Sequence, residues 1–538
     1  MYTFSLAPAG TPELLPAVPD VVGEEAFALP VVQNMDKLWQ GPADVTVSRF
    51  AEKRSGRDVL EIKYWLKELG SRSHLDYILP ADRPVAERLR FWIRGDGSGN
   101  NLQLLCYHAL SRKWISLAEI RLDFRNWRHL EIPASNPIYR YHKTVTAFRF
   151  ELSANKRMYH FGQCRLLLSG MELVCPKLVT RPAKYKVIPT PAFDTWGAPP
   201  RQYIPFGAQM GTTIHMSSVG FPDGGDVAQR TGYAAKAVKW TREAGIMPGI
   251  SFYSAPTREW MDKHPDLLVK NQVGQRHAAP AAFTSPWNPT ARKLWREHII
   301  ECLNYLKAND SLRYVQLVEL CPGEESIVSF EWSKVWAFDE YAVRAYRNYL
   351  RKRYRDDISR LNADWASEYH NFDDILPPDS YYPDRAHWVF ADFYRLSMLR
   401  YCVFLADSVR KVFTPKYWLW MVHSVGSYPH RFYSARYPLF YTENMRRLGC
   451  LDYAQIAALD WQGIEDVQYL QRSGARVIGE IDIRPEPDRL KWTFDQCRKF
   501  AMDGVFIGVL EIHSAKGELT PIGRLCRQLI RDFKASPR

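Results

Sequence analysis

The chain has 538 residues, of which 46% are hydrophobic and 24% charged, and this describes a folded protein with an ample core and more than one domain. No apolar run is long enough to cross a bilayer, and the start, MYTFSLAPAGTPELLP, lacks the basic and continuous apolar regions of a secretory signal peptide. We therefore expect no membrane partner. The expected location is cytoplasmic or, if a leader has been removed, periplasmic or secreted.

The nine cysteines are scattered and never form a Cys-x-x-Cys pair, which argues against a zinc site and a disulfide framework. The net charge of +13 and the pI near 9.2 suggest an anionic partner, such as nucleic acid or an acidic polysaccharide, or simply high solubility. Basic residues such as Arg344, Arg347 and Arg351 are spread over predicted helix surfaces instead of forming a tail or one long patch, so we expect no nucleic-acid partner.

The first part of the chain is divided by composition. Residues 1–20 are rich in Pro and Ala and predict an irregular leader. Residues 21–175 alternate apolar and polar positions in short segments separated by turn residues, which predicts a β-sandwich of jelly-roll type. The expected strands include 58–66, 88–100, 102–110, 144–153 and 164–174. This domain is either a carbohydrate-binding module or a structural support, and the sequence leaves both open.

Residues 176–200 contain six prolines and predict a linker that enters the next domain. From residue 201 to 538 the pattern alternates strand and helix, which is typical of a parallel α/β fold. Six strand–helix units are clear, and two further strands are expected between 185 and 214. Together they predict a (β/α)8 barrel, or TIM barrel. The clearest elements are helices 228–244, 290–307, 331–354, 387–413, 463–473, 491–502 and 522–533, and strands 246–253, 314–320, 417–423, 451–457, 476–481 and 504–510.

The segment after Ser254, SAPTREWMDKHPDLLVKNQVGQRHAAPAAFTSPWNP, resembles the β-galactosidases of glycoside hydrolase family 42. That family has a segment of the form A-P-x-x-W-x-x-x-H/Y-P-E-L-L after its third strand. The matching residues here are Ala255, Pro256, Trp260, His264, Pro265, Asp266, Leu267, Gly274, Arg276 and Pro289. One extra residue separates Pro256 from Trp260, and Asp266 replaces the family's Glu.

Further segments resemble the same family in the same order along the chain. They are RNYLRKRYRDDISRLNADWASEYHNFDDILPP (347–378), ADFYRLSMLRYCVFLADSVRKVFTP (391–415) and MDGVFIGVLE (502–511). The resemblance covers about residues 190–510. It implies a TIM barrel that hydrolyses β-glycosidic bonds with retention of configuration, with an oligo- or polysaccharide as substrate. The family's later domains are missing, and the N-terminal sandwich is not part of its usual plan.

Retaining glycosidases use two carboxyl groups about 5–5.5 Å apart, one as the nucleophile and one as the acid/base. In the resembled family the nucleophile ends strand seven, which places it at Glu480 in ARVIGEIDIRPEP. The other interpretation of Glu480 is a buried ion pair with Arg484 or another arginine of the barrel. The acid/base ends strand four, and in SLRYVQLVELCPGEES two residues remain open for that role, Glu319 and Glu324. Family members carry an Asn before this acid, whereas Val318 stands here.

Polar and aromatic residues follow several other predicted strands, where a TIM barrel carries its chemistry. We expect them to bind substrate: Asp482, His423, Asp460, Trp461, Glu511, His513 and Trp196. Trp260, in contrast, is expected to pack beneath the loop after strand three. His and Cys show no ligand spacing, so we expect neither a metal nor a cofactor.

Two further functions stay open at this point. The same chemistry on an acidic or otherwise modified sugar would agree with the positive net charge. A carbohydrate-binding protein that has lost catalysis would agree with the missing Asn before Glu319.

Overall fold

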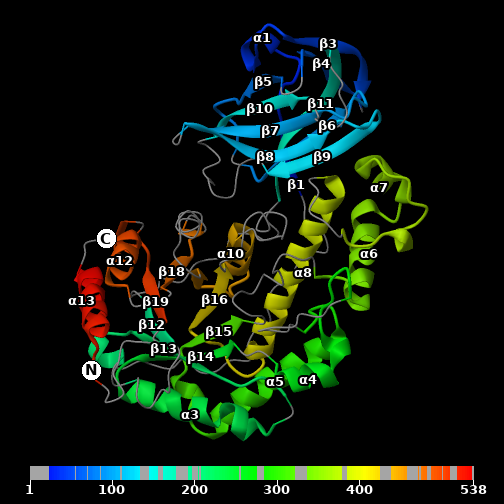
Figure 1. Cartoon of the computed structure of the whole chain (residues 1–538). Helices are drawn as coiled ribbons and strands as arrows, with labels where there is room; N and C mark the ends of the chain where they lie inside the picture. Colours follow the sequence, from blue (N-terminus) through cyan, green and yellow to red (C-terminus); the bar gives the residue numbers. More distant parts are fainter. Residues whose placement is uncertain are drawn as a thin grey trace. The chain divides into compact units, whose positions relative to one another are not determined.

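In the computed structural model the described residues are 24–54, 56–68, 71–84, 86–109, 112–133, 145–154, 162–176, 192–196, 204, 207–223, 225–253, 256–274, 284–321, 336–378, 384–423, 438–456, 470–471, 474–481, 486–499, 501–508 and 518–535. The chain divides into two compact units (Figure 1). One contains residues 178–345 and 394–538, and the other contains residues 20–177 and 346–393.

The first unit contains eight parallel strands in the order β12-β19-β18-β17-β16-β15-β14-β13. The strands at the two ends of this order, β12 and β13, also lie next to each other. Every strand therefore neighbours the strands that precede and follow it in the chain, as in a (β/α)8 barrel. The strands are β12 (Ala192–Trp196), β13 (Ile214–Ser218), β14 (Met247–Tyr253), β15 (Leu317–Cys321), β16 (Tyr417–His423), β17 (Tyr453–Ile456), β18 (Arg476–Ile481) and β19 (Gly504–Gly508).

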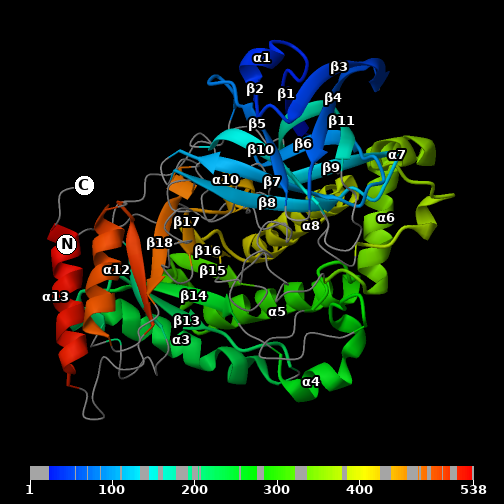
Figure 2. The same ribbon diagram turned by 45° about the horizontal axis from the view of Figure 1, so that its top comes forward.

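Helices follow these strands along the chain, and several of them, such as α3, pack against the sheet (Figures 1 and 2). They are α3 (Val227–Glu243), α4 (Arg258–Lys263), α5 (Pro289–Ala308), α6 (Glu340–Tyr354), α8 (Arg385–Arg410), α10 (Pro438–Arg447), α12 (Pro487–Lys499) and α13 (Pro521–Ala535). Local sequence explains where they begin. Asn288 caps α5 by accepting hydrogen bonds from the backbone N–H groups of Thr290 and Ala291 at 2.8 and 3.3 Å, and Pro289 occupies the first turn, where no donor is needed.

The second unit contains two antiparallel sheets that share one hydrophobic core. The larger sheet has the order β3-β4-β11-β6-β9, with β1 added on β11, and the smaller has the order β2-β5-β10-β7-β8. Strict alternation in β7, where every second side chain is buried, is the period expected of a strand with one face in a core. The strands are β1 (Glu24–Ala28), β2 (Trp39–Gln40), β3 (Val45–Arg54), β4 (Arg57–Leu66), β5 (Arg72–Ile78), β6 (Arg88–Arg94), β7 (Asn101–His108), β8 (Lys113–Arg121), β9 (Trp127–Pro133), β10 (Val145–Ser153) and β11 (Gly162–Pro176).

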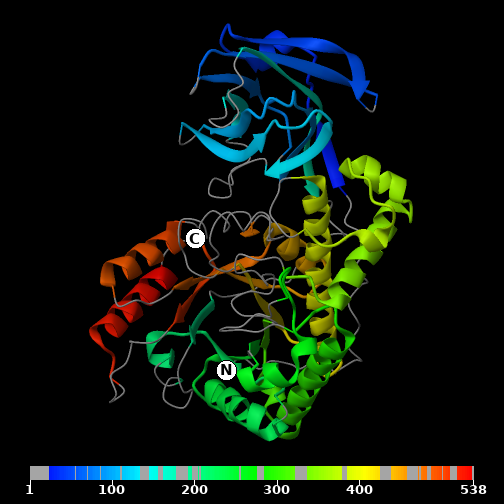
Figure 3. The ribbon, with the colours of Figure 1, turned by 45° about the vertical axis from the view of Figure 1, so that its right-hand side comes forward.

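Helical residues 346–393 belong to this second unit although they follow barrel strands in the sequence. They include α7 (Ile358–Trp365), which contacts β9 (Figure 3). Several predicted elements differ in extent from the structure: predicted strand 88–100 ends at Arg94, strand 314–320 begins at Leu317, and helix 491–502 begins at Pro487. Helix 331–354 is described only from Glu340, and strand 451–457 is shorter, from Tyr453 to Ile456. Most of predicted helix 463–473 lies outside the described residues.

The strand-rich N-terminal region is thus two packed antiparallel sheets, and its jelly-roll connectivity stays a prediction. The seven cysteines whose side chains are described are all free thiols. No helix among the described residues is long and apolar enough to cross a membrane.

Candidate active site

The interior of the barrel begins with a layer of apolar side chains from successive strands. It consists of Ile214, Met216, Leu317, Tyr417, Leu419, Tyr453 and Ile478, all buried. These side chains identify the inward face of the strands that carry them, β13, β15, β16, β17 and β18. Because alternate residues of a strand point to the same face, the residue two positions further along each strand also belongs to the inward face, nearer the C-terminal end. In a TIM barrel that end carries the chemistry.

Glu319 is the residue two positions after Leu317 on β15. It is paired with Ser251 of β14 and with Leu419 of β16. Its side chain is buried, with 7% of its surface exposed. Burial raises the pKa of the Glu319 carboxyl to about 7, and the neighbouring Ser251 hydroxyl acts in the opposite direction. By distance and angle the Ser251 Oγ makes no hydrogen bond of ordinary geometry with any described residue, so its effect on Glu319 is weak. The raised pKa allows this carboxyl to keep its proton closer to neutral pH than an exposed glutamate does.

Position 480 occupies the corresponding place on β18. It follows Ile478 by two residues, so strand alternation assigns it to the inward face, and its backbone pairs with Phe506 of β19. The Glu480 side chain lies outside the described part of the structure. Strands β16 and β17 separate β15 from β18 in the sheet. Glu319 and Glu480 thus both stand within two residues of the C-terminal ends of their strands, Cys321 and Ile481.

The other predicted site residues have less structural support. His423 ends β16 and Trp196 ends β12, so both are at the expected edge of the barrel, but their side chains lie outside the described part. The remaining predicted residues lie outside the described residues altogether: Glu324, Asp482, Asp460, Trp461, Glu511 and His513. The packing role predicted for Trp260 is confirmed, since its buried ring contacts Phe221 edge-to-face at 4.9 Å.

Two polar residues on the inward face were missed by the sequence analysis. Ser251 lies two positions after Gly249 on β14 and contacts Glu319. Gln455 lies two positions after the core residue Tyr453 on β17 and is almost completely buried. A polar residue in phase with an apolar inward position was a usable signal for Gln455. Ser251 carried no such signal, because a serine in an apolar strand is common on either face.

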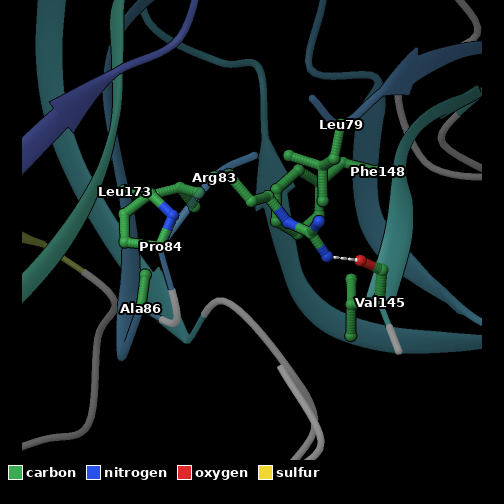
Figure 4. Close-up of a pocket in the computed structure, with 7 residues that line it drawn as sticks. All are labelled: Leu79, Arg83, Pro84, Ala86, Val145, Phe148 and Leu173. Carbon is green, nitrogen blue, oxygen red and sulfur yellow. Dashed lines mark hydrogen bonds between the residues drawn. The ribbon is translucent and has the colours of Figure 1, made fainter. Parts of the chain in front are cut away.

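Two other features of the described residues do not compete with this site. No group of three or more His, Cys, Asp or Glu side chains among them is arranged to hold a metal ion. A small pocket in the sandwich is lined by apolar residues and by Arg83, which donates a hydrogen bond to the carbonyl of Val145 (Figure 4). Arg83 also donates a hydrogen bond to the carbonyl of Pro80. Because this guanidinium is already occupied and the pocket carries no carboxyl group, it offers no glycoside chemistry.

Comparison with known proteins confirms the family resemblance. The glycoside hydrolase family 42 model, described as "Beta-galactosidase", matches residues 250–423. This segment contains β15 with Glu319 and ends with β16. No curated protein matches the sequence.

Among solved structures, the catalytic domain of a β-amylase from Paenibacillus polymyxa is similar with a TM-score of 0.54 and 15% identity, over 65% of this chain and 100% of that chain. A Clostridium thermocellum endo-1,4-β-D-xylanase with its CBM22-1 and GH10 modules covers 91% of this chain and 94% of its own, at 10% identity and a TM-score of 0.32. An exo-β-agarase covers 92% and 97%, at 8% identity and a TM-score of 0.37. The β-amylase likeness supports the TIM-barrel fold. The family match supports a glycosidase, and residues 250–423 are similar to glycoside hydrolase family 42.

Proposed function

We propose that this protein is a retaining glycoside hydrolase that cleaves β-glycosidic bonds, with β-galactosides as the first substrates to test. The observation that carries the proposal is Glu319, a buried carboxyl on the inward face near the end of β15. Its pKa of about 7 suits a group that must donate a proton and later accept one. The family match over this strand supports the reaction class.

In the proposed reaction Glu319 is the acid/base and Glu480 the nucleophile. The Glu480 carboxylate attacks the anomeric carbon while Glu319 protonates the glycosidic oxygen, so that the bond to the leaving group breaks as the bond to Glu480 forms. Glu319, now ionised, then takes a proton from water, and the water oxygen displaces Glu480. The neighbouring Ser251 hydroxyl favours the ionised form between these two steps.

Glu319 is preferred over Glu324 as the acid/base because it belongs to the strand itself and its side chain is enclosed. The buried environment raises its pKa, which is the physical requirement for an acid that works at neutral pH. The substrate-binding roles of Asp482, His423, Asp460, Trp461, Glu511, His513 and Trp196 remain part of this proposal. An oligo- or polysaccharide as the substrate is also part of this proposal.

The test is hydrolysis of a panel of aryl β-glycosides by Glu480→Gln and Glu319→Gln variants. We expect Glu480→Gln to lose activity on every substrate. Glu319→Gln should lose about 10²- to 10⁴-fold on glycosides with poor leaving groups but much less on dinitrophenyl glycosides, which leave without protonation. Glu297→Gln, an exposed carboxylate on α5, is the matched control and should retain full activity.

Activity that is unchanged in both variants would contradict the proposed roles. A parent protein that turns over no member of the panel but binds oligosaccharides would favour the alternative function, a binding protein without catalysis. Val318, which stands where family members have Asn, is the observation that keeps this alternative in view.

A further inference from the structure

A cluster of arginines lies between helices α5 and α8, on the outer layer of the barrel unit. Arg292 and Arg296 are one turn apart on α5, and both guanidinium groups lie over the ring of Phe404 on α8, at 4.4 and 4.3 Å from its centroid. Arg400 stands one turn before Phe404 on α8 and is close enough to affect the charge of Arg292. The ring of Phe404 is held by the buried Tyr401, which stacks nearly parallel to it at 6.3 Å.

No carboxylate among the described residues is paired with Arg292 or Arg296, although many other described arginines have such a partner. Neighbouring cations illustrate the contrast: Lys293 on the same turn is paired with Glu297 at 3.7 Å, and Arg230 is paired with Glu301 at 3.0 Å. The Nε of Arg296 is buried and has no hydrogen-bond partner in the described part of the chain. Two adjacent guanidinium groups are thus partly removed from water, and no described residue supplies a counter-charge.

Burial and neighbouring positive charge make the ionised form of Arg292 less favourable than that of an exposed arginine. Burial lowers the pKa of Arg292, Tyr401 acts in the opposite direction, and the positive charges of Arg296 and Arg400 lower it further. An anion held between the guanidinium groups would supply the missing counter-charge and accept their N–H donors. The planar fork of arginine is well suited to sulfate, phosphate and carboxylate oxygens, and such charge-assisted hydrogen bonds are stronger than neutral ones.

We propose that Arg292 and Arg296 form a binding site for a tetrahedral oxyanion of the sulfate or phosphate class. The anion is either a free inorganic ion or a sulfate ester carried by a polysaccharide, and this second source rests on the proposed glycosidase function. Arg292 and Arg296 lie in the first two turns of α5. Because barrel helices run opposite to the strands, these turns are at the same end of the barrel as the C-terminal ends of β14 and β15. A sulfated chain that extends from the candidate active site would leave it at this end.

The test is titration calorimetry with sodium sulfate and inorganic phosphate at constant ionic strength, and then with a sulfated galactan and its desulfated form. The Glu480→Gln background removes turnover, so that binding is measured whether or not the protein proves to be a glycosidase. We expect saturable binding of sulfate or phosphate to the parent. The Arg292→Gln/Arg296→Gln variant should weaken it by at least about tenfold. Arg296→Lys should give an intermediate loss because it keeps the charge but not the fork.

The matched control is Lys293→Gln, which removes one positive charge from an exposed, paired residue of the same helix turn. It should bind within about twofold of the parent, and unchanged thermal unfolding should show that all variants are folded. Tighter binding of the sulfated than of the desulfated galactan identifies the ester as the ligand, whereas binding of the inorganic ions alone identifies a free-anion site. Absence of binding to the parent, or an equal loss in Lys293→Gln, would overturn the proposal.

Discussion

An acid/base residue must be able both to donate a proton and to exist as the ionised carboxylate, and burial of Glu319 favours the first and opposes the second. Its carboxyl is buried inside the barrel, and burial raises its pKa to about 7. A neutral acid in this position can donate a proton, and its ionised form is costly to keep. Among the described residues, the Ser251 hydroxyl is the group that lowers the pKa of Glu319 and so favours its ionised form.

The first prediction concerns the pH dependence of hydrolysis. A general acid must be protonated, so kcat/KM should fall as pH rises through about 7, the pKa of Glu319. The neighbouring Ser251 hydroxyl lowers that pKa, so Ser251→Ala should move the alkaline limb to higher pH. Ser217→Ala, which changes a buried serine on the neighbouring β13, is the control and should leave the limb in place. An alkaline limb that does not move in Ser251→Ala would show that this contact does not set the pKa.

The second prediction concerns stability, and its sign follows from proton linkage. The pKa of Glu319 is higher in the folded protein than its ordinary value of 4.5, so the folded state binds more protons between these values. The stability associated with the neutral acid is complete below about 4.5 and is lost as pH rises through about 7. The change from 4.5 to about 7 corresponds to ~3 kcal/mol.

Glu319→Gln, which cannot ionise, should therefore be more stable than the parent at pH 8 and differ little at pH 5. Urea unfolding at both pH values measures this. A variant that is less stable than the parent at pH 8 would show that the ionised carboxylate is compensated by groups other than Ser251.

The sequence identified Glu319 because an acid that interrupts an apolar strand is conspicuous. It left Glu319 and Glu324 both open as the acid/base and slightly favoured Glu319, because that residue lies on the strand itself. The structure adds that the Glu319 side chain is buried. Ser251 was out of reach for sequence analysis because its importance comes from a neighbour 68 positions away (319 − 251) in an adjacent strand.

At the scale of elements, the barrel strands pack closely enough to require a glycine on β14. A Cβ at Gly249 would overlap the sulfur of Met216 and would lie 3.0 Å from the Met216 Cε and 3.3 Å from the Leu317 Cδ2. Met216 and Leu317 are both part of the apolar layer beneath the candidate site. The packing of the apolar layer beneath the candidate site therefore depends on the lack of a side chain at Gly249.

The third prediction is that Gly249→Ala destabilises the barrel by about 1–3 kcal/mol, since overpacking forces neighbours out of their rotamers. Gly232→Ala is a control with the same chemical change in the middle of helix α3, where the nearest atom to the new Cβ is 3.4 Å away. It should be neutral or stabilising by up to about 1 kcal/mol. Urea unfolding of both variants checks the difference, and equal effects would contradict the packing argument.

The bounds of strands and helices were predicted correctly where the local sequence pattern determines them. Strands 417–423 and 476–481 have the predicted bounds, because short apolar runs between a helix and a polar turn leave little choice. Helix 387–413 was shifted by about one turn at its C-terminal end, where α8 stops at Arg410. Capping and fraying decide such ends, and the hydrophobic pattern does not record them.

At the scale of the whole molecule, the unit formed by residues 20–177 and 346–393 contains a buried network of charges. Arg385 contacts Glu24 at 2.8 Å and Asp364 at 2.8 Å, and it also pairs with Glu131. Arg88 is completely buried and contacts Glu24, Glu131 and Asp392, each at 3.4 Å. The network joins strands β1, β6 and β9 of the sheets to helices α7 and α8.

Proton linkage gives this network a pH dependence as well. Burial by itself would raise the pKa of Glu24, but the charges of Arg385, Arg88, Arg353 and Arg90 lower it well below the usual value. Its contribution to stability is therefore present above about 4.5 and is lost as pH falls through the lowered pKa.

The fourth prediction is that Arg385→Met destabilises this unit by about 3–5 kcal/mol, because it leaves Glu24, Glu131 and Asp364 with one cation fewer in a buried place. Arg360→Met on α7 is the control. It removes an exposed arginine paired only with Asp357 and should cost less than about 1 kcal/mol. Guanidinium unfolding followed by far-UV circular dichroism measures both, and a similar cost for the two variants would contradict the role of the network.

Sequence analysis predicted the barrel and the strand-rich N-terminal region of this chain but not this network. The partners are contributed by residues more than 250 positions apart, such as Glu131 and Arg385, and each looks like an ordinary surface charge in its own segment. Amphipathic pattern reports burial of apolar residues only. Buried ion pairs therefore become visible when the segments are placed together in three dimensions.

The central claim is that Glu480 and Glu319, from separate strands of one barrel, act together in a covalent double displacement. The most direct measurement is trapping with an activated 2-deoxy-2-fluoro β-glycoside, followed by mass spectrometry of peptides from the labelled protein. The account predicts one sugar bound per chain, attached to Glu480, and faster release of that sugar from the parent than from Glu319→Gln. A label on another residue, or turnover that proceeds without any covalent intermediate and inverts the anomeric centre, would contradict it.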